Sequence, residues 1–237
     1  MRAEPRPLSR LDLENDLLRR TLEASPLAAQ VASEAELEAS LRATLASPHR
    51  DGDIWLFGYG SLVWNPVLEF DQRRVVTTHG YHRSFCLWSR VNRGTPEDPG
   101  LVLALDRGGR CTGVAYRIPA RLAEAELRLL WRREMLLGSY AARWVHVTHG
   151  EQAFRALAFV VNRDRPGYSG RLPAERIVDI LCQARGTLGS GLDYLRQTLD
   201  GLAAVGIRDP NLIHIDALVR RRLGEDEPHR PRADLQL

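Results

Sequence analysis

The segment Ile54-Trp55-Leu56-Phe57-Gly58-Tyr59-Gly60-Ser61-Leu62 joins a strand pattern to a glycine-rich turn. Its first four residues are all apolar and lead directly into a glycine, which is typical of a short buried strand. The two glycines and the serine allow the backbone to turn sharply, so that its N–H groups point toward a cavity. We therefore expect a strand that ends in a turn able to bind an anion or an oxyanion.

This turn resembles two known motifs, one that binds dinucleotides and one that carries a catalytic serine, and the neighbouring residues exclude both. A dinucleotide-binding loop needs a third glycine and a helix, whereas Val63-Trp64-Asn65-Pro66 follows here. A hydrolase nucleophile elbow needs glycines two places before and after its serine, and these places hold Tyr59 and Val63. The spacing alone leaves two interpretations open, an anion-binding turn and a purely structural one.

The residues on both sides of this segment predict an α+β fold. Extended patterns cover 73–90, 101–106, 111–118, 144–148 and 153–161, and a helix is expected at 122–136. Asp106-Arg107-Gly108-Gly109 has the composition of a hairpin turn. Because strands mostly precede helices and tight turns connect them, we expect a small mixed or antiparallel β-barrel with surrounding helices.

Helical patterns dominate the two ends of the chain. Apolar periodicity predicts a helix over 11–24, and Ser33 with Glu36 forms a capping box for a second one that runs to Leu45. Further helices are expected at 173–185, 191–204 and 211–223. We therefore divide the chain into a helical extension (1–50), one domain (51–224) and a charged flexible tail (225–237).

The composition excludes several classes of protein. All 33 basic residues are arginine, so the chain has no lysine for a Schiff base or a phosphate-binding loop. The net charge of +3 is spread among 30 acidic residues, which favours a solvated surface over a nucleic-acid-binding face and leaves a small anionic substrate as an alternative. No apolar run is long enough to span a membrane, and the charged start is unlike a signal peptide.

The cysteines and histidines predict neither disulfides nor a metal site. Cys86, Cys111 and Cys182 are odd in number and far apart, which indicates a reducing, cytoplasmic environment. His79 and His82, like His146 and His149, are three residues apart in expected strands, so their side chains point to opposite faces. The sequence gives no indication of the oligomeric state.

Glu134 occupies an apolar position of the helix expected at 122–136. Leu127, Leu130 and Trp131 form the apolar stripe, and Glu134 is its next member. A carboxylate on a buried face loses hydration, which raises its pKa toward the value that a general base needs near pH 7. The alternative is a structural ion pair with Arg132, Arg133 or another arginine.

Several motifs together resemble the ChaC-like γ-glutamylcyclotransferases. They are Phe57-Gly58-Tyr59-Gly60-Ser61-Leu62, Asn92-Arg93-Gly94-Thr95, Pro99-Gly100-Leu101, Gly113-Val114-Ala115-Tyr116-Arg117, Arg133-Glu134 with Gly138-Ser139-Tyr140, and Ser190-Gly191 with Asp193-Tyr194-Leu195. The resemblance covers roughly residues 54–205. The sequence departs from the family pattern at Ser139, where a second glycine is more usual, and at Met135-Leu136-Leu137. Both departures lie at the expected pocket rim.

The resemblance implies an enzyme that cleaves the γ-glutamyl amide of glutathione without a cofactor or metal. The α-amine of the substrate attacks its own γ-carbonyl, giving 5-oxoproline and cysteinylglycine, and Glu134 is the expected general acid and base. By family position, the backbone of Gly60, Ser61 and Leu62 stabilises the oxyanion and holds the glutamyl carboxylate. Tyr59 is expected to pack beside this loop, Tyr140 to bond the substrate or Glu134, and Arg93 to receive the glycyl carboxylate.

Three other functions are compatible with the same residues. The first is the same cyclisation of other γ-glutamyl peptides or amines, since the departures at 135–139 affect the rim. The second is a catalytically silent binding or regulatory protein, against which Gly58, Gly60 and Glu134 are all present. A serine hydrolase using Ser61 would need a nearby base and lacks the elbow.

Overall fold

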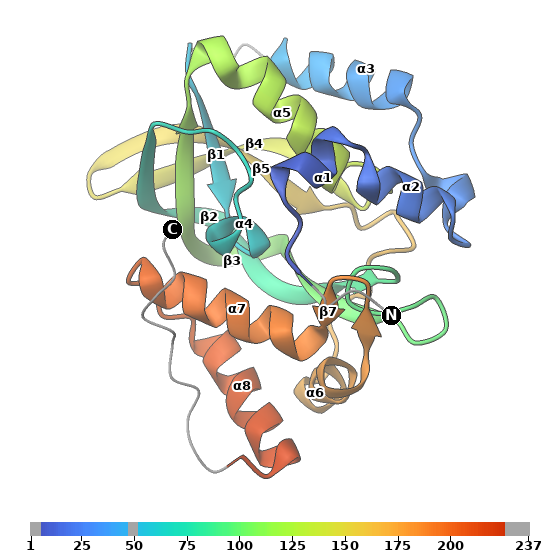
Figure 1. Cartoon of the computed structure of the whole chain (residues 1–237). Coiled ribbons are helices and arrows are strands. Elements are labelled where there is room, and N and C mark those ends of the chain that lie inside the picture. The colour runs from blue at the N-terminus through green and yellow to red at the C-terminus, as the bar shows by residue number, and fades with distance from the viewer. Residues whose placement is uncertain (1–5, 47–51, 226–237) are drawn as a thin grey trace.

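The computed structural model describes residues 6–46 and 52–225, and its centre is a closed β-barrel (Figure 1). Its five strands are β1 (Ile54–Gly58), β2 (Gln72–Ser89), β3 (Gly100–Ile118), β4 (Tyr140–His149) and β5 (Gln152–Val161). Around the barrel their order is β1-β3-β2-β4-β5. The predicted α+β barrel with surrounding helices is therefore confirmed.

Most strand pairs of the barrel are antiparallel. The β1–β3, β2–β3, β2–β4 and β4–β5 pairs all run this way. Two short parallel contacts close the sheet on itself, Leu56 with Leu157 between β1 and β5 and Leu105 with Val160 between β3 and β5. Leu56, Leu105 and Leu157 have no exposed surface, so the apolar faces of these strands fill the barrel.

The hairpin predicted at Asp106–Gly109 is wrong. The chain runs through this segment as one continuous strand, β3, which pairs with β2 along nearly its whole length. Gly80, Gly108 and Gly109 adopt positive φ angles where the β2–β3 register shifts, so these glycines form a bulge that bends the two long strands. The turn that connects them lies at residues 90–99.

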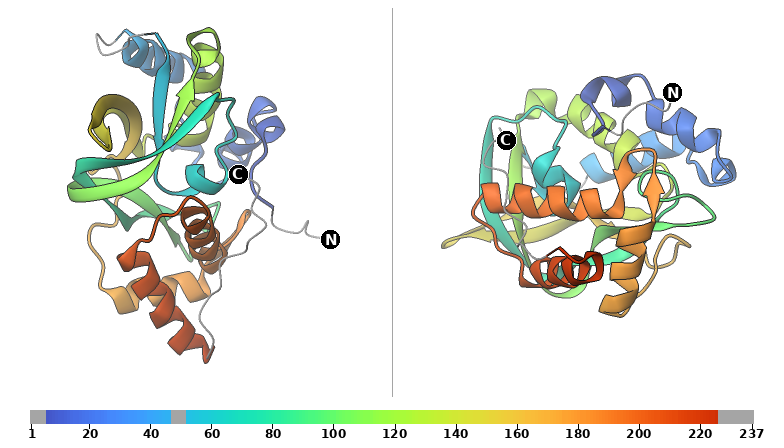
Figure 2. Two further views of the ribbon diagram at one scale, coloured as in Figure 1. Left: turned by 90° about the vertical axis from the view of Figure 1, so that its left-hand side faces the viewer. Right: turned by 60° about the horizontal axis from the view of Figure 1, so that its bottom comes forward.

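The helix predicted over 11–24 is two short helices. Helices α1 (Arg10–Glu14) and α2 (Leu17–Glu23) are separated because Asp16 adopts a left-handed conformation, with φ 52°. A 3₁₀ turn, η1 (Ala28–Gln30), leads to α3 (Glu34–Leu45), whose predicted Ser33–Glu36 capping box is present. These helices pack beside α5 (Ala120–Glu134) at one end of the barrel (Figures 1 and 2).

The C-terminal helices lie at the opposite end of the molecule (Figure 2). They are α6 (Ala174–Gln183), α7 (Gly191–Ala204) and α8 (Pro210–Leu223), close to the predicted ranges. The two-residue strands β6 (Arg185–Gly186) and β7 (Gly189–Ser190) precede α7, and a single helical turn, α4 (Ser61–Trp64), packs on α7. In the described residues no helix has the length and apolar character needed to cross a bilayer.

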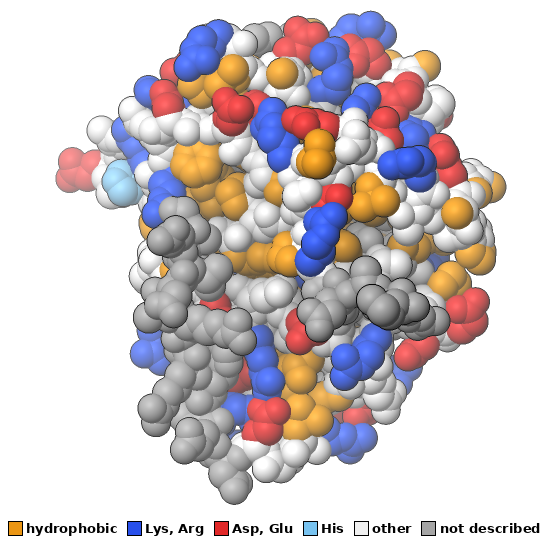
Figure 3. Space-filling view, viewed as in Figure 1, with side chains coloured by type: hydrophobic (Ala, Val, Ile, Leu, Met, Phe, Trp, Pro, Cys, Tyr) orange, Lys and Arg blue, Asp and Glu red, His pale blue; other side chains and the backbone are white. Residues whose placement is uncertain are grey.

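Other sequence predictions have mixed outcomes. Arginine and acidic side chains are intermingled over the face in Figure 3, as expected for a solvated surface. Cys86 and Cys111 are buried free thiols, and burial raises the pKa of Cys86 to about 12. The predicted boundary near residue 50 and the tail beyond Glu225 lie outside the described residues, so both stay predictions.

Candidate active site

A cavity of about 180 Å³ brings together all the candidate site residues. Glu134 lines it from the end of α5, and Gly60, Ser61 and Leu62 line it from the turn after β1. Tyr59, Arg93 and Tyr140, from three different parts of the barrel domain, complete the predicted set. Residues far apart in the sequence therefore share one cavity.

Glu134 is a largely buried carboxylate with two opposing influences on its proton affinity. Its side chain is 13% exposed, at the wall of the cavity. Burial raises the pKa of Glu134 above its ordinary value, and the positive charge of Arg133 lowers it in part. The net direction is upward, as a carboxylate that exchanges protons near neutral pH requires.

Arg133 joins this carboxylate to the glycine-rich turn. Its Nε lies 3.0 Å from Glu134 Oε1, Nη2 donates to Ser61 Oγ at 2.8 Å, and Nη1 donates to the carbonyl of Asn65 at 2.6 Å. The guanidinium thus holds both ends of α4 and the carboxylate at once. The ion pair between Arg133 and Glu134, one of the two alternatives above, is therefore present, and the catalytic role of Glu134 stays a prediction.

The turn after β1 leaves little room for side chains at its two glycines. A Cβ atom on Gly60 would lie 3.0 Å from the Tyr194 hydroxyl oxygen, and one on Gly58 would lie 3.1 Å from Leu62 Cβ. Helix α4 begins immediately after Gly60. The first N–H groups of a helix have no acceptor within it, so those of Ser61 and Leu62 are available to an oxygen atom in the cavity.

Three tyrosines line the same cavity as Glu134, and of these Tyr59 and Tyr194 are buried while Tyr140 is half-buried. Tyr59 donates its hydroxyl to the carbonyl of Phe159 at 2.6 Å, and the negative charge of Glu134 contributes to raising the pKa of Tyr59, Tyr140 and Tyr194. Burial is the larger cause in each case. The Tyr140 hydroxyl, predicted to bond the substrate or Glu134, donates here to the Leu103 carbonyl at 3.3 Å.

Arg93 places a buried cation at the cavity wall. Its guanidinium donates to the carbonyl of Leu188 at 2.6 Å and lies over the ring of Tyr194, 5.5 Å from the ring centre. Burial lowers the pKa of Arg93. Arg90, which also lines the cavity, is only half-buried and has a long 3.4 Å contact with the Pro166 carbonyl. Two arginines are thus available for a carboxylate ligand.

Ser61 does not have the surroundings of a hydrolytic nucleophile. Its hydroxyl accepts a hydrogen bond from the permanently charged Arg133 guanidinium, and no histidine is among the described residues that line the cavity. Nucleophilic serines need an adjacent base. Within the described ranges 6–46 and 52–225, no cluster of three or more His, Cys, Asp or Glu side chains is arranged to hold a metal ion.

The model of the ChaC-like protein family matches residues 54–222 of this chain. The chain belongs to the ChaC-like family. The glutathione-specific γ-glutamylcyclotransferase of Escherichia coli strain K12 is 41% identical over 191 residues, which cover 80% of this chain and 83% of that protein. The human glutathione-specific γ-glutamylcyclotransferase 1 is 36% identical over 167 residues, which cover 67% of this chain and 75% of that protein.

The fold of this ChaC-like chain is also that of a solved yeast protein. The crystal structure of a yeast γ-glutamylcyclotransferase specific to glutathione superposes with a TM-score of 0.66 at 21% identity. The similarity covers 72% of this chain and 97% of the yeast chain. It confirms the expected barrel-and-helices architecture.

The sequence did not single out three contributors to the site. Tyr194 lies within a quoted motif, but its place against Gly60 and under the Arg93 guanidinium comes from the structure alone. Arg90 precedes the Asn92–Thr95 motif and has no feature that separates it from the other arginines. Five apolar residues between Pro7 and Leu27 also line the cavity, although they precede the family match.

Proposed function

We propose that this chain is a γ-glutamylcyclotransferase that acts on glutathione. The observation that carries the proposal is the buried Glu134 carboxylate, with its raised pKa, in the same cavity as the glycine-rich turn. The relatives from E. coli and human are named for this activity, and the family match includes every candidate site residue.

The reaction needs one proton carrier and no nucleophile from the protein. In the proposed mechanism, the α-amine of the glutamyl group attacks the γ-carbonyl carbon and closes a five-membered ring. Glu134 removes a proton from the attacking nitrogen and delivers it to the departing cysteinyl nitrogen as the γ-amide bond breaks. The products are 5-oxoproline and cysteinylglycine, so no water is consumed and the proton is returned.

The cavity supports the two other requirements of this mechanism. The oxyanion that forms on the γ-carbonyl oxygen needs hydrogen-bond donors already in place, and the free N–H groups of Ser61 and Leu62 are suitable. Ring closure also needs the substrate held in a folded conformation, which an enclosed cavity favours by limiting its freedom. Arg93 is proposed to bind the glycyl carboxylate, since an arginine fork matches a carboxylate.

The reaction and its substrate range are tested together with purified protein. We expect release of 5-oxoproline and cysteinylglycine from glutathione, with slower release from γ-glutamyl dipeptides and γ-glutamyl amines. Faster turnover of one of those compounds would show that it, and not glutathione, is the preferred substrate. Binding without release from any of them would favour a regulatory protein, and inactivation by a fluorophosphonate would favour Ser61 as a nucleophile.

The cellular setting is proposed on the sequence alone. The scattered cysteines favour a cytoplasmic location, and the mixed surface charge favours a small-molecule substrate over nucleic acid as the partner.

A further inference from the structure

The N-terminal segment supplies an aliphatic wall to the cavity. Pro7, Leu8, Leu18, Leu22 and Leu27 line the same cavity as Glu134. The four leucines are buried, with exposed fractions between 4% and 9%. The family match starts at residue 54, so the matched domain alone does not form this wall. We refer to these five residues as the N-terminal wall.

Hydrogen bonds to two backbone carbonyls attach the N-terminal segment to the elements that carry the candidate reactive groups. Asn65 donates its side-chain amide to the carbonyl of Leu8 at 2.8 Å, and Ala32 donates its N–H to the carbonyl of Leu136 at 2.7 Å. Asn65 directly follows α4, and Leu136 lies two residues after Glu134. The wall therefore adjoins the glycine-rich turn, and the segment that carries it is also attached two residues beyond Glu134.

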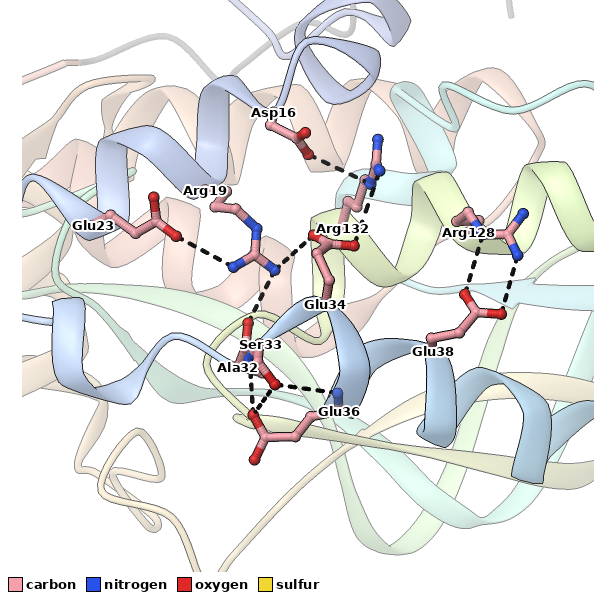
Figure 4. Close-up of polar contacts among 10 residues, drawn as sticks. All are labelled: Asp16, Arg19, Glu23, Ala32, Ser33, Glu34, Glu36, Glu38, Arg128 and Arg132. Carbon is pink, nitrogen blue, oxygen red and sulfur yellow. Dashed lines mark hydrogen bonds and ion pairs between the residues drawn. The ribbon is translucent and has the colours of Figure 1, made fainter.

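Ion pairs add a second set of attachments to α5. Both Nη atoms of Arg10 bond the buried Glu126 carboxylate, at 2.7 and 2.8 Å, and the N–H of Glu69 bonds the same carboxylate at 3.0 Å. Figure 4 shows further contacts, in which α5 meets the N-terminal segment through Arg132 with Asp16 and Glu34 and through Arg128 with Glu38. These contacts attach the N-terminal segment, which carries the wall, to α5.

The chemistry of the proposed reaction limits which part of the substrate can touch this wall. The glutamyl group carries an ammonium and a carboxylate. Aliphatic side chains cannot form a hydrogen bond with either group, so the glutamyl group is not expected to bind at the wall. Glu134 protonates the departing nitrogen, so the residue that bears this nitrogen must lie beside Glu134. The wall lines the same cavity as Glu134 and Leu136. The thiol side chain of the cysteinyl residue, which bears the departing nitrogen, is the least polar part of glutathione.

We infer that the N-terminal wall is the subsite for the side chain of the residue joined to the γ-carbonyl, and that it limits the size of that side chain. This inference rests on the proposed function. It assigns substrate selection to the N-terminal segment and bond cleavage to the barrel domain.

The test compares two tripeptides, glutathione and γ-glutamyl-leucyl-glycine, by kcat/KM for 5-oxoproline release. Leu22→Ala enlarges the wall and is expected to raise the ratio of the leucyl peptide to glutathione about tenfold, the scale of one or two methylene groups in an apolar pocket. Leu8→Ala is a second variant that enlarges the wall, at a position that lies outside any helix. Thermal unfolding identifies which of the variants remain folded.

The matched control is Leu11→Ala, in the same segment but 62% exposed, and it should leave the ratio unchanged. Equal ratios in Leu22→Ala, Leu8→Ala and Leu11→Ala, with an active unmodified protein, would overturn the subsite and leave the proposed function standing. An unmodified protein that releases no 5-oxoproline from either peptide would overturn both.

Discussion

At the scale of single residues, the pKa of one carboxylate, Glu134, is subject to two opposing effects. Burial raises the pKa of Glu134 and the Arg133 charge opposes that effect. The same guanidinium also bonds Ser61 Oγ, so we propose that Arg133 positions both the turn and Glu134, the proposed acid-base group. The amphipathic pattern of α5 predicted the buried carboxylate, whereas the contacts of Arg133 depend on how α4 packs against the end of α5.

Replacing Arg133 should shift the pH dependence of the reaction. In Arg133→Gln the favourable charge is lost, so the pKa of Glu134 rises further. Because the base must be ionised to accept a proton, the acid limb of the kcat/KM profile should move to higher pH. The matched control is Arg132→Gln, which removes a neighbouring arginine that pairs with Asp16. A limb that stays in place, or shifts equally in the control, would contradict this role.

The effect of substitutions on KM distinguishes whether Arg93 or Arg90 binds the glycyl carboxylate. If Arg93 binds the glycyl carboxylate, Arg93→Ala should raise the KM for glutathione about tenfold or more, as expected for a lost charged hydrogen bond. The increase should disappear with glutathione amide, which lacks that carboxylate. The same pattern in Arg90→Ala, with no change in Arg93→Ala, would assign the carboxylate to Arg90.

At the scale of elements, the apolar patterns located the longer helices and the barrel strands, but not the short elements or the connections of the barrel. The predicted capping box at Ser33 marks a real helix start, and the structure shows a second one at Ser190. The segment Asp106–Gly109 has turn residues, yet it continues through a bulge because β2 offers a partner along its whole length. Such long-range pairing outweighs local turn preference, and no local pattern could reveal it.

At Gly80, in the β2–β3 bulge, the cost of a substitution should depend on how readily the new residue adopts a positive φ angle. Gly80 has a φ of 84°, and a Cβ atom there would meet nothing within 4 Å. Gly80→Val should therefore lower the free energy of unfolding by about 1–3 kcal/mol through backbone strain alone. Gly80→Asn should cost less, because asparagine adopts positive φ more readily. Equal losses in urea-induced unfolding would contradict this explanation.

At the scale of the whole molecule, the N-terminal segment is joined to the barrel domain through the site itself. Helices α1, α2 and α3 lie in this segment, and no pattern in the sequence indicated that Leu8 or Leu22 would line the cavity. That position depends on distant partners such as Asn65 and Glu126, which lie more than fifty residues away. Periodicity identifies a buried face and does not identify what covers it.

Loss of the Arg10–Glu126 pair should loosen this attachment. Arg10→Ala leaves the Glu126 carboxylate buried without its cation, and we expect unfolding to become easier by about 2 kcal/mol. This is below the cost for a fully buried pair because the Arg10 side chain is 34% exposed. Glu14→Ala removes the exposed second partner of Arg10 and should cost at most about 0.5 kcal/mol. Equal effects in chemical unfolding would show that the buried pair contributes nothing.

The most direct test of the mechanism is 5-oxoproline release from glutathione by the unmodified protein and by Glu134→Gln. Glutamine keeps the size of the side chain but cannot carry the proton, so the variant should remain folded and lose activity about a hundredfold or more. Near-normal turnover by a folded Glu134→Gln protein would contradict the role of Glu134 as the acid-base group.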